Sequence, residues 1–504
     1  MVLLLGWVEP LAESLWEFDP VLGSFCAKVG ALPCVAGLGP SQRRPSGSKA
    51  MAMTGVPYDC DVLVVGGGNA ALCAAIAARR AGAAVLLLEA APKALRGGNA
   101  RHSRNMRVMH DAPTPWVRGR YPADDYLADL RRVAGDADDG LARLFVDASA
   151  DIVDWLAGNG VRFQSCADEV LPYSRKTAFF LGGGKALVNA LYATADGLGV
   201  AIRYDSTVRG LHLRDGAPAV TVGEPGVTVT ARALVVVSGG FQADPGWLRR
   251  EWGKAADRFA IRGTPHATGI PLKALLDEGA EPVGAADRCH MVAVDGRAPP
   301  FDGGIVTRLD GIAHGIVVDR DGRRFADEGA VVGPSRYTAW GELVVRCPGA
   351  VAFSIFDAAI ETRFRPSIFP AIRADSIGEL ARDLGISPPA LEATMAGFNA
   401  AITDGGGTAG VDPPKTRLAE PIMVPPFGAY PVRAGVTSTC LGVRVDERAR
   451  VLRRDGAGLE GVYAAGVVMA PNILGCGYLA GGAMTVGAVF GRIAGREAAA
   501  HALR

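Results

Sequence analysis

Asp61-Val-Leu-Val-Val-Gly-Gly-Gly-Asn-Ala-Ala71 is the stretch of sequence that decides the fold. The run Asp61–Val65 is almost wholly apolar and predicts a buried parallel strand. The alanine-rich run Ala70–Arg80 predicts a helix directly after it, and Ala84–Leu88 predicts a second strand. A strand, a helix and a second strand in this order predict an α/β fold with a parallel sheet.

The turn between the first strand and the helix has the spacing of a dinucleotide-binding loop. Gly66 permits the tight turn, Gly68 lets a pyrophosphate approach the backbone, and the small Ala71 allows the helix to pack closely on the strand. The helix N-terminus then offers unpaired amides to the phosphates. Glu89, at the end of the second strand, is placed to accept hydrogen bonds from an adenosine ribose. The candidate loop comprises Gly66, Gly67, Gly68, Asn69, Ala70 and Ala71.

Further clusters of small residues decide between NAD and FAD, which the loop alone leaves open. Gly97-Gly-Asn99 follows Glu89, Gly239-Gly240 ends a later apolar strand, and Gly466 ends another near the C-terminus. Three separated clusters favour a long, extended dinucleotide such as FAD. The cofactor-binding candidates beyond the loop are Glu89, Gly97, Gly98, Asn99, Val208, Gly239, Gly240, Gly466 and Gly481.

Composition excludes several classes of protein. There are 53 Lys and Arg residues against 52 Asp and Glu residues, so the chain lacks the basic excess of a nucleic-acid-binding protein. The nine cysteines are scattered without a CxxC pair, which indicates neither a disulfide framework nor a metal site and favours a cytoplasmic setting. We expect no secretion signal. Residues 461–491 are uncharged, but their eight glycines indicate a buried core rather than a membrane span.

The character of the sequence changes along the chain and predicts its domains. Residues 1–57 lack sustained periodicity, which predicts a poorly ordered N-terminal extension. Paired prolines and glycine runs punctuate residues 290–435, which predicts an inserted second domain. Residues 58–289 and 436–504 are expected to form the dinucleotide-binding domain. Its further elements are predicted as helices at 124–134, 141–159 and 186–197, a strand-rich block at 200–237, and a final helix reaching residue 504.

Over about residues 58–504 these motifs resemble the flavoprotein-subunit family of fumarate reductases, succinate dehydrogenases and L-aspartate oxidases. Arg96-Gly-Gly-Asn99 resembles the segment beside the FAD pyrophosphate and ribityl chain, and Gly481–Arg492 resembles the helix that faces the flavin N1/O2 edge. The resemblance implies a mixed α/β (α+β) architecture, with a Rossmann-like FAD-binding domain and an inserted capping, substrate-binding domain at 290–435. It also implies non-covalent FAD and a redox reaction at a CH–CH group.

Two segments resemble the catalytic region of that family. Gly322–Gly329 followed by Pro334-Ser-Arg336-Tyr337 is similar to its Arg-Phe-x-Asn/Asp-Glu pattern with a later Arg-Asp, and the resemblance implies that Arg336 transfers the proton. Such a role requires a buried, cation-rich site, because a guanidinium is otherwise protonated. His290 matches a substrate-binding, catalytic histidine, and Thr307 matches a threonine that contacts a substrate carboxylate. The plainer alternatives are an ion-paired surface arginine and a structural histidine.

The sequence also departs from the family pattern. Thr437-Ser-Thr-Cys440 replaces the segment with the second anion-binding histidine, Tyr478 replaces an arginine, Val467 replaces an acid and Arg308 replaces a glutamate. Positive charge gathers instead in the loop after Asn99. A polyanion-binding role and a solvated surface are both open for this loop. The substrate-binding candidates are Thr307, Arg104, Arg107, His110 and Tyr478.

Together these features resemble the tricarballylate dehydrogenase branch of the family. That resemblance implies desaturation of tricarballylate to cis-aconitate, in which a base removes a proton α to a carboxylate and flavin N5 accepts a hydride. The open alternatives are a fumarate-reductase-like or 3-ketosteroid-dehydrogenase-like enzyme with another substrate, and a non-enzymatic flavoprotein. The expected partners are a small polycarboxylate and a separate electron-acceptor protein. A membrane-bound acceptor would bring the cytoplasmic enzyme to a membrane.

We predict that FAD is bound tightly but not covalently. His102 is the histidine nearest to the flavin-proximal segment, but it lies in a basic loop rather than in the family's His-Thr attachment sequence. Acid precipitation should therefore release the yellow flavin into the supernatant. Flavin that stays with the protein pellet would contradict this prediction.

Overall fold

The computed structural model describes residues 59–135, 138–166, 175–214, 217–301, 303, 306–332 and 337–504. The predicted strand–helix–strand unit is confirmed as β1 (Cys60–Val65), α1 (Asn69–Arg80) and β2 (Val85–Leu88). The strands β1 and β2 are parallel, with Val62 opposite Val85. The expectation for residues 1–57 lies outside the described residues.

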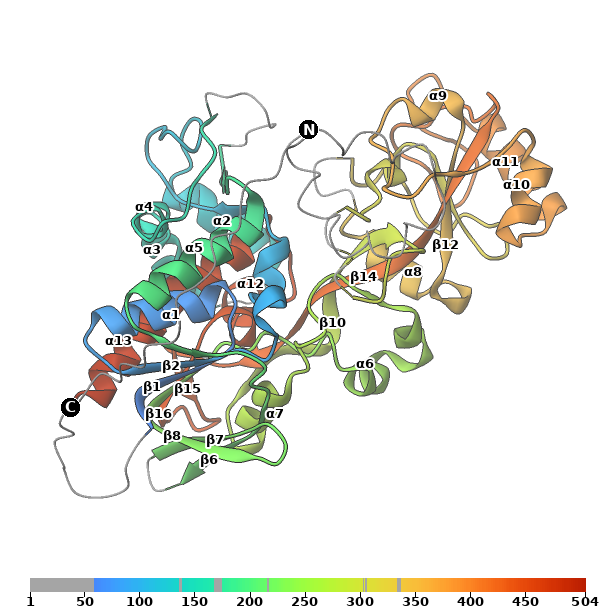
Figure 1. Cartoon of the computed structure of the whole chain (residues 1–504). Coiled ribbons are helices and arrows are strands. Elements are labelled where there is room, and N and C mark those ends of the chain that lie inside the picture. The colour runs from blue at the N-terminus through green and yellow to red at the C-terminus, as the bar shows by residue number, and fades with distance from the viewer. Residues whose placement is uncertain are drawn as a thin grey trace, which may run out of the picture. The chain divides into compact units, whose positions relative to one another are not determined.

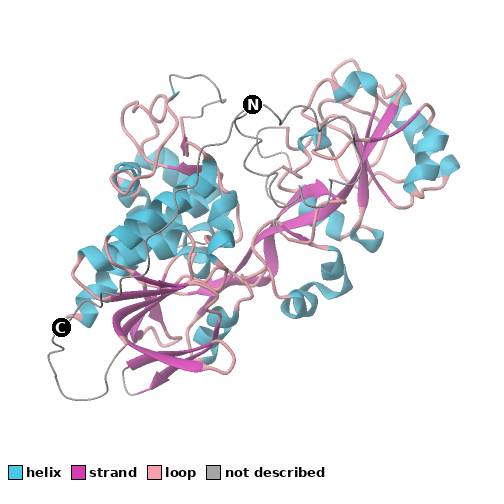
Figure 2. Ribbon diagram, viewed as in Figure 1, coloured by secondary structure: helices cyan, strands magenta, loops and turns pink. Residues whose placement is uncertain are grey.

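The first sheet has the order β15-β16-β8-β1-β2-β5, and β7 and β6 extend it beside β8. The strands β16, β8, β1, β2 and β5 run parallel, so their carboxyl ends share one edge of the sheet. The run of buried apolar residues in β1, β2 and β8 is typical of a parallel sheet that is covered on its faces. Figure 2 shows a layer of helices against this sheet.

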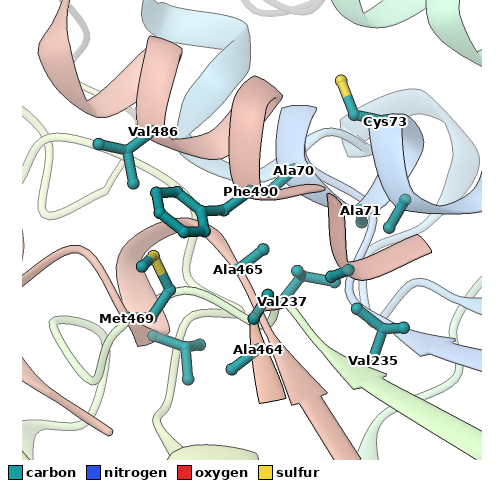
Figure 3. Close-up of a cluster of buried hydrophobic side chains, with 14 of the residues drawn as sticks. Ala70, Ala71, Cys73, Val235, Val237, Ala464, Ala465, Met469, Val486 and Phe490 are labelled. Carbon is teal, nitrogen blue, oxygen red and sulfur yellow. The ribbon is translucent and has the colours of Figure 1, made fainter. Parts of the chain in front are cut away.

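The core beneath that layer depends on close contact between α1 and α13 (Gly482–Ala502). Phe490 and Met469 pack over the small side chain of Ala465, as Figure 3 shows. Glycines that recur every four residues on α13 allow the two helices to approach. A Cβ atom on Gly491 would lie 3.1 Å from the Cα of Ala70.

A second sheet has the order β10-β14-β12-β11, and β9 and β13 also pair with β14. Its two long strands, β10 (Pro282–Asp295) and β14 (Phe427–Val443), are antiparallel (Figure 1). One part of this pair packs with the first core, whereas Ala293 and Val432 belong to a separate hydrophobic core. Contacts group Tyr58–Arg504 into one unit.

The bounds of the remaining elements complete the fold. The strands are β3 (Asn105–Arg107), β4 (Thr177–Phe179), β5 (Ala201–Arg203), β6 (Val208–Arg214), β7 (Ala217–Val222), β8 (Val227–Val236), β9 (Ala260–Ile261), β11 (Ile316–Asp319), β12 (Ala352–Phe356), β13 (Ile372–Ala374), β15 (Arg450–Leu452) and β16 (Gly458–Ala464). The helices are α2 (Ala123–Ala134), α3 (Asp139–Ala148), α4 (Ile152–Ala157), α5 (Gly183–Gly197), α6 (Pro245–Trp252), α7 (Ile270–Asp277), α8 (Trp340–Val345), α9 (Ala358–Glu361), α10 (Ile377–Leu384), α11 (Pro388–Ala400) and α12 (Pro471–Leu474).

One predicted helix is wrong in its length. The segment 141–159 holds two helices, α3 and α4, with a turn between them. The hydroxyl of Ser149 donates to the carbonyl of Val146 at 2.7 Å and accepts from the amide of Met109 at 3.0 Å. A side chain that bonds to the backbone in this way competes with helix continuation.

The uncharged segment 461–491 divides into β16, a turn, α12 and the start of α13. Within the described ranges, none of the helices combines the length with the apolar character that a membrane crossing requires.

We predict that Gly491→Val destabilises the protein by about 1–3 kcal/mol, because overpacking forces α1 and α13 apart. Gly397→Ala in α11 is the matched control, since a Cβ there has open space. The control should leave stability unchanged or raise it by up to about 1 kcal/mol. Urea unfolding of the FAD-loaded protein measures both changes. Equal stability of Gly491→Val and the unsubstituted protein would contradict this account of the core.

Candidate active site

A cleft of about 1280 Å³, including its open mouth, begins at the carboxyl edge of the first sheet. The turn Gly66–Gly68 and the first residues of α1 line one end. A Cβ atom on Gly66 would lie 2.5 Å from the carbonyl oxygen of Val237, so this close approach of the two strand ends requires glycine. The N-terminus of α1 thus opens onto the cleft.

Glu89 lies in the cleft wall at the end of β2 and is buried. Its carboxylate accepts hydrogen bonds from the amides of Ala91 at 3.0 Å and Gly97 at 3.1 Å, and from the hydroxyl of Tyr192 at 3.4 Å. A carboxylate has about four lone-pair directions, so these bonds orient Glu89 and leave it able to accept from a ribose.

Asn99 connects the cofactor loop to two other parts of the chain. Its side-chain amide donates to the carbonyl of Thr437 on β14 at 2.6 Å, and its carbonyl accepts from the amide of Thr264 at 3.0 Å. Thr264 follows β9, which pairs with β14 at Val436. These bonds fix the far end of the cleft against the second sheet.

The polar groups of the cleft, as well as its extent, suit an extended dinucleotide. Ser238 Oγ and Gln242 Oε1 are buried beside it and have no hydrogen-bond partner among the described residues. Buried polar atoms without partners are costly, so both are suited to a polar ligand. Ala483 and Met484 bring the N-terminus of α13 to the same cleft, where its amides favour negative charge.

Most of the predicted cofactor residues line this cleft, and four do not. Those that line it are Gly66, Gly67, Gly68, Asn69, Ala70, Glu89, Gly98, Asn99, Val208, Gly239 and Gly466. Ala71 is buried in the core, Gly97 donates to Glu89, Gly240 faces Thr439, and Gly481 packs against β3. These four residues lie behind the residues that line the cleft and help to set its shape.

Positive charge gathers around Arg262, next to the Asn99 connection. The Arg262 guanidinium donates to the hydroxyl of Thr437 at 2.7 Å. Desolvation, followed by the positive charge of Arg308, lowers the pKa of Arg262 to about 10. Arg104 acts in the same direction. We call these three residues, Arg262, Arg308 and Arg104, the arginine cluster. Arg262 could not be identified from the sequence, because Arg262-Gly-Thr264 matches no recognised motif.

His290 and Tyr478 form a second part of the same site. Their rings stack with centroids 4.0 Å apart and an interplanar angle of 4°. Desolvation, followed by the charge of Arg262, lowers the pKa of His290 to about 3. Burial and the hydrogen bond with Tyr337 raise the pKa of Tyr478, against the opposing charges of Arg104 and Arg262. His290 is therefore a neutral hydrogen-bonding group at neutral pH.

Arg107 and His110, predicted to bind substrate, are placed elsewhere. Arg107 is buried and pairs with Asp129 at 2.9 Å. Tyr121 and Lys176 also contact this carboxylate; burial opposes its ionisation, but these partners keep the pKa of Asp129 below its usual value. His110 is buried beside a different hollow, formed with Trp116 and Asp154. Arg104 is exposed, and of the three it alone contributes charge to the arginine cluster.

The cap residues expected from the family resemblance are described in part. The Thr307 hydroxyl is buried and donates to the carbonyl of Gly303 at 3.2 Å. Arg324 and Glu328 form a buried ion pair of 2.5 Å, so that part of the segment has a structural contact. Arg336 lies outside the described residues. Its neighbour Tyr337 lies beneath Arg308, with the guanidinium carbon 4.1 Å from the ring centroid.

Sequence comparison finds similar proteins over most of the chain. The family described as FAD binding domain matches residues 61–483. The fumarate reductase (cytochrome) of Shewanella frigidimarina is 26% identical over 482 residues, which cover 89% of this chain and 79% of that protein. The 3-oxosteroid 1-dehydrogenase of Mycobacterium tuberculosis is 26% identical over 363 residues, which cover 61% of this chain and 62% of that protein.

Other matches are shorter or concern the fold. The NADH:acrylate oxidoreductase of Vibrio harveyi is 30% identical over 277 residues, which cover 53% of this chain and 26% of that protein. The match therefore spans about a quarter of that relative. Among solved structures, the open conformation of a flavocytochrome c3 fumarate reductase superposes with a TM-score of 0.71 at 23% identity, covering 88% of this chain and 79% of that one. This likeness confirms the fold.

We predict a stability contribution from His290 that disappears in acid. Because its pKa is about 3 in the folded chain and about 6.5 in an unfolded one, the unfolded state binds the extra proton between these values. His290 therefore destabilises the fold as pH falls from about 6.5 to 3, by up to about 1.4 kcal/mol per pH unit. Urea unfolding between pH 6.5 and 4 should show a shallower dependence in both His290→Asn and His290→Gln. Slopes equal to that of the unsubstituted protein would contradict the prediction.

Proposed function

The chain belongs to the FAD binding domain family and is an FAD-dependent oxidoreductase acting on CH–CH groups, and we propose that its substrate is a small polycarboxylate. The specific reaction we propose is the oxidation of tricarballylate to cis-aconitate. The proposal requires the substrate to lie at the end of the cleft that Asn99 fixes against β14.

The observation that carries this proposal is the arginine cluster. Arg262 is desolvated and feels the positive charge of both Arg308 and Arg104. Like charges that act on a desolvated guanidinium raise the free energy of the empty site, and a bound polyanion would relieve that repulsion. Arg308 forms an ion pair with Asp310 at 2.7 Å, which offsets part of the positive charge of the cluster. The positive charge that remains suits a substrate with a small number of carboxylates.

The chain's own groups divide the remaining work. The guanidinium groups would bind and orient the carboxylates, and His290 stacked on Tyr478 would form an uncharged wall beside them. A fixed substrate geometry can supply much of the rate acceleration. When bound, FAD supplies the hydride acceptor. We propose Arg336 as the group that moves the proton, because Tyr337, the next residue, contacts Arg308 and Tyr478.

A second candidate function is oxidation of a ketone substrate such as a 3-ketosteroid. The hydroxyls of Tyr478 and Tyr337 share a hydrogen bond, and such a pair is able to donate to a carbonyl oxygen. The relative from Mycobacterium tuberculosis carries a matching name. The arginine cluster favours the carboxylate substrate, since a neutral ketone would leave its charge unbalanced.

We also propose that a separate protein accepts the electrons. The fumarate reductase of Shewanella frigidimarina has a cytochrome in its printed name, and the present chain has no CxxCH haem-attachment sequence. A membrane location for this acceptor protein is part of the same proposal.

We predict turnover of tricarballylate by the FAD-loaded protein with an artificial electron acceptor. Arg104→Ala should raise KM about tenfold, at the lower end of the cost of losing a charge-assisted contact because Arg104 is exposed. Arg336→Lys should abolish turnover but leave tricarballylate binding nearly intact, because lysine keeps the charge and loses the guanidinium. Steady-state kinetics, with binding followed by the flavin spectrum, measures these effects.

Arg143→Ala is the control, since Arg143 pairs with Asp147 on the exposed surface of α3. It should leave both kcat and KM unchanged. Turnover of a 3-ketosteroid in place of tricarballylate would support the second candidate. Normal turnover by Arg336→Lys would remove Arg336 from the mechanism.

A further inference from the structure

Two cysteines that are 36 residues apart in sequence meet next to the segment that carries Tyr478. Cys440 lies on β14 and Cys476 follows α12. The Cys440 thiol donates to the backbone carbonyl of Cys476 at 3.9 Å, and the two thiol groups are close enough that each shifts the pKa of the other. No motif in the sequence joins them, because they lack the spacing of a redox pair.

We propose that Cys440 and Cys476 are a redox-modification site, which peroxide converts into a reversible disulfide that weakens substrate binding at the neighbouring Tyr478. The disulfide itself is independent of the proposed function. Its effect on binding rests on that function, and the two are measured separately below.

The two thiols differ in exposure and in pKa, and a reaction with peroxide requires one exposed thiol of low pKa. Cys476 is partly exposed, and the hydrogen bond from Cys440, followed by the charge of Arg288 and the backbone of Ala285, lowers its pKa to about 7. Burial and the negative charge of Asp287 oppose this shift. Cys440 is buried, and its hydrogen bond to Cys476 together with burial raises its pKa. Cys476 is thus the thiolate that attacks first.

The chemistry balances with hydrogen peroxide as the oxidant. The Cys476 thiolate attacks one peroxide oxygen, the O–O bond breaks, and the departing hydroxide takes a proton to become water. The product is a sulfenic acid on Cys476. The Cys440 sulfur then attacks that sulfur, forming the S–S bond and releasing a second water. In total two thiols lose two hydrogens and two electrons, and a dithiol such as dithiothreitol reverses the reaction.

A third thiol, Cys289, lies close enough to compete. It belongs to β10 and is paired in register with Thr439, the residue before Cys440. Cys289 is buried, and burial raises its pKa to about 12, so it is protonated at neutral pH. It therefore lacks the reactive form, and the structure assigns the bond to Cys440 and Cys476.

The bond would affect the site because Tyr478 is two residues from Cys476. A disulfide brings the two sulfurs to about 2 Å, much closer than hydrogen-bonded thiols. Cys440 is held in β14, where it pairs with Ala285, whereas Cys476 lies in a turn between α12 and α13. The turn is the part that must move, and it carries Tyr478 away from its stack on His290.

The test treats the FAD-loaded, full-length protein with hydrogen peroxide and maps its peptides by mass spectrometry. We expect a cross-linked peptide pair holding Cys440 and Cys476, with the loss of two hydrogens and full reversal by dithiothreitol. The rate should rise about tenfold from pH 6 to pH 8 as the thiolate fraction grows. Cys476→Ser should abolish the cross-link, and Cys289→Ser should retain it. Cys166→Ser, which changes a partly exposed cysteine elsewhere, should also retain it.

Three results would overturn the proposal. Cys476 that is oxidised only to sulfinic acid, with Cys440 left free, would show that the pair cannot close. A cross-link through Cys289 would show that the disulfide does not join Cys440 and Cys476. A disulfide that forms but leaves the dissociation constant of tricarballylate unchanged would remove the coupling to Tyr478. We expect that constant to rise at least severalfold and to recover after reduction. Failure of the reduced protein to bind tricarballylate would count against the proposed function and not against the disulfide.

Discussion

The side-chain amide of Asn99 makes the two hydrogen bonds on which the arrangement of the site depends. One joins the cofactor loop to Thr437 on β14, and the other joins it to Thr264 beyond β9. The first contact continues to Arg262, which donates to the Thr437 hydroxyl. A single residue from the cofactor motif thereby sets the distance between the cofactor cleft and the arginine cluster. There is no spare volume, since a Cβ atom on Gly263 would overlap Asn99.

This connection places a desolvated cation beside a redox cofactor site, and the electrostatic consequences follow from it. The positive charges of Arg308 and Arg104 raise the free energy of the charged Arg262 guanidinium when the site is empty. Burial, followed by the charge of Arg262, keeps His290 neutral, so that histidine adds no further repulsion. A substrate with several carboxylates balances the site better than a neutral one. The proposed polycarboxylate specificity is therefore a consequence of charge balance rather than of one specific contact.

The sequence predicted the parts that depend on local pattern. Gly66 to Ala71 and the strands beside them follow from backbone and packing rules, and most of that loop lines the cleft. It could not predict Arg262, whose role depends on β9 pairing with a strand 175 residues later. It also gave no sign of the ion pair between Arg107 and Asp129, because Asp129 lies on a separate helix. The domain boundaries remain our proposal, and β14 crosses the one drawn between residues 435 and 436.

The most direct test of the account is the affinity of the FAD-loaded protein for carboxylates that share one carbon skeleton and differ in charge. Titration of the flavin spectrum gives dissociation constants for propane-1,2,3-tricarboxylate and for its mono- and diesters. The arginine cluster predicts that each carboxylate removed weakens binding by about tenfold or more. Equal affinity across the series, or tighter binding of the least charged ester, would contradict the claim that the arginine cluster selects the substrate.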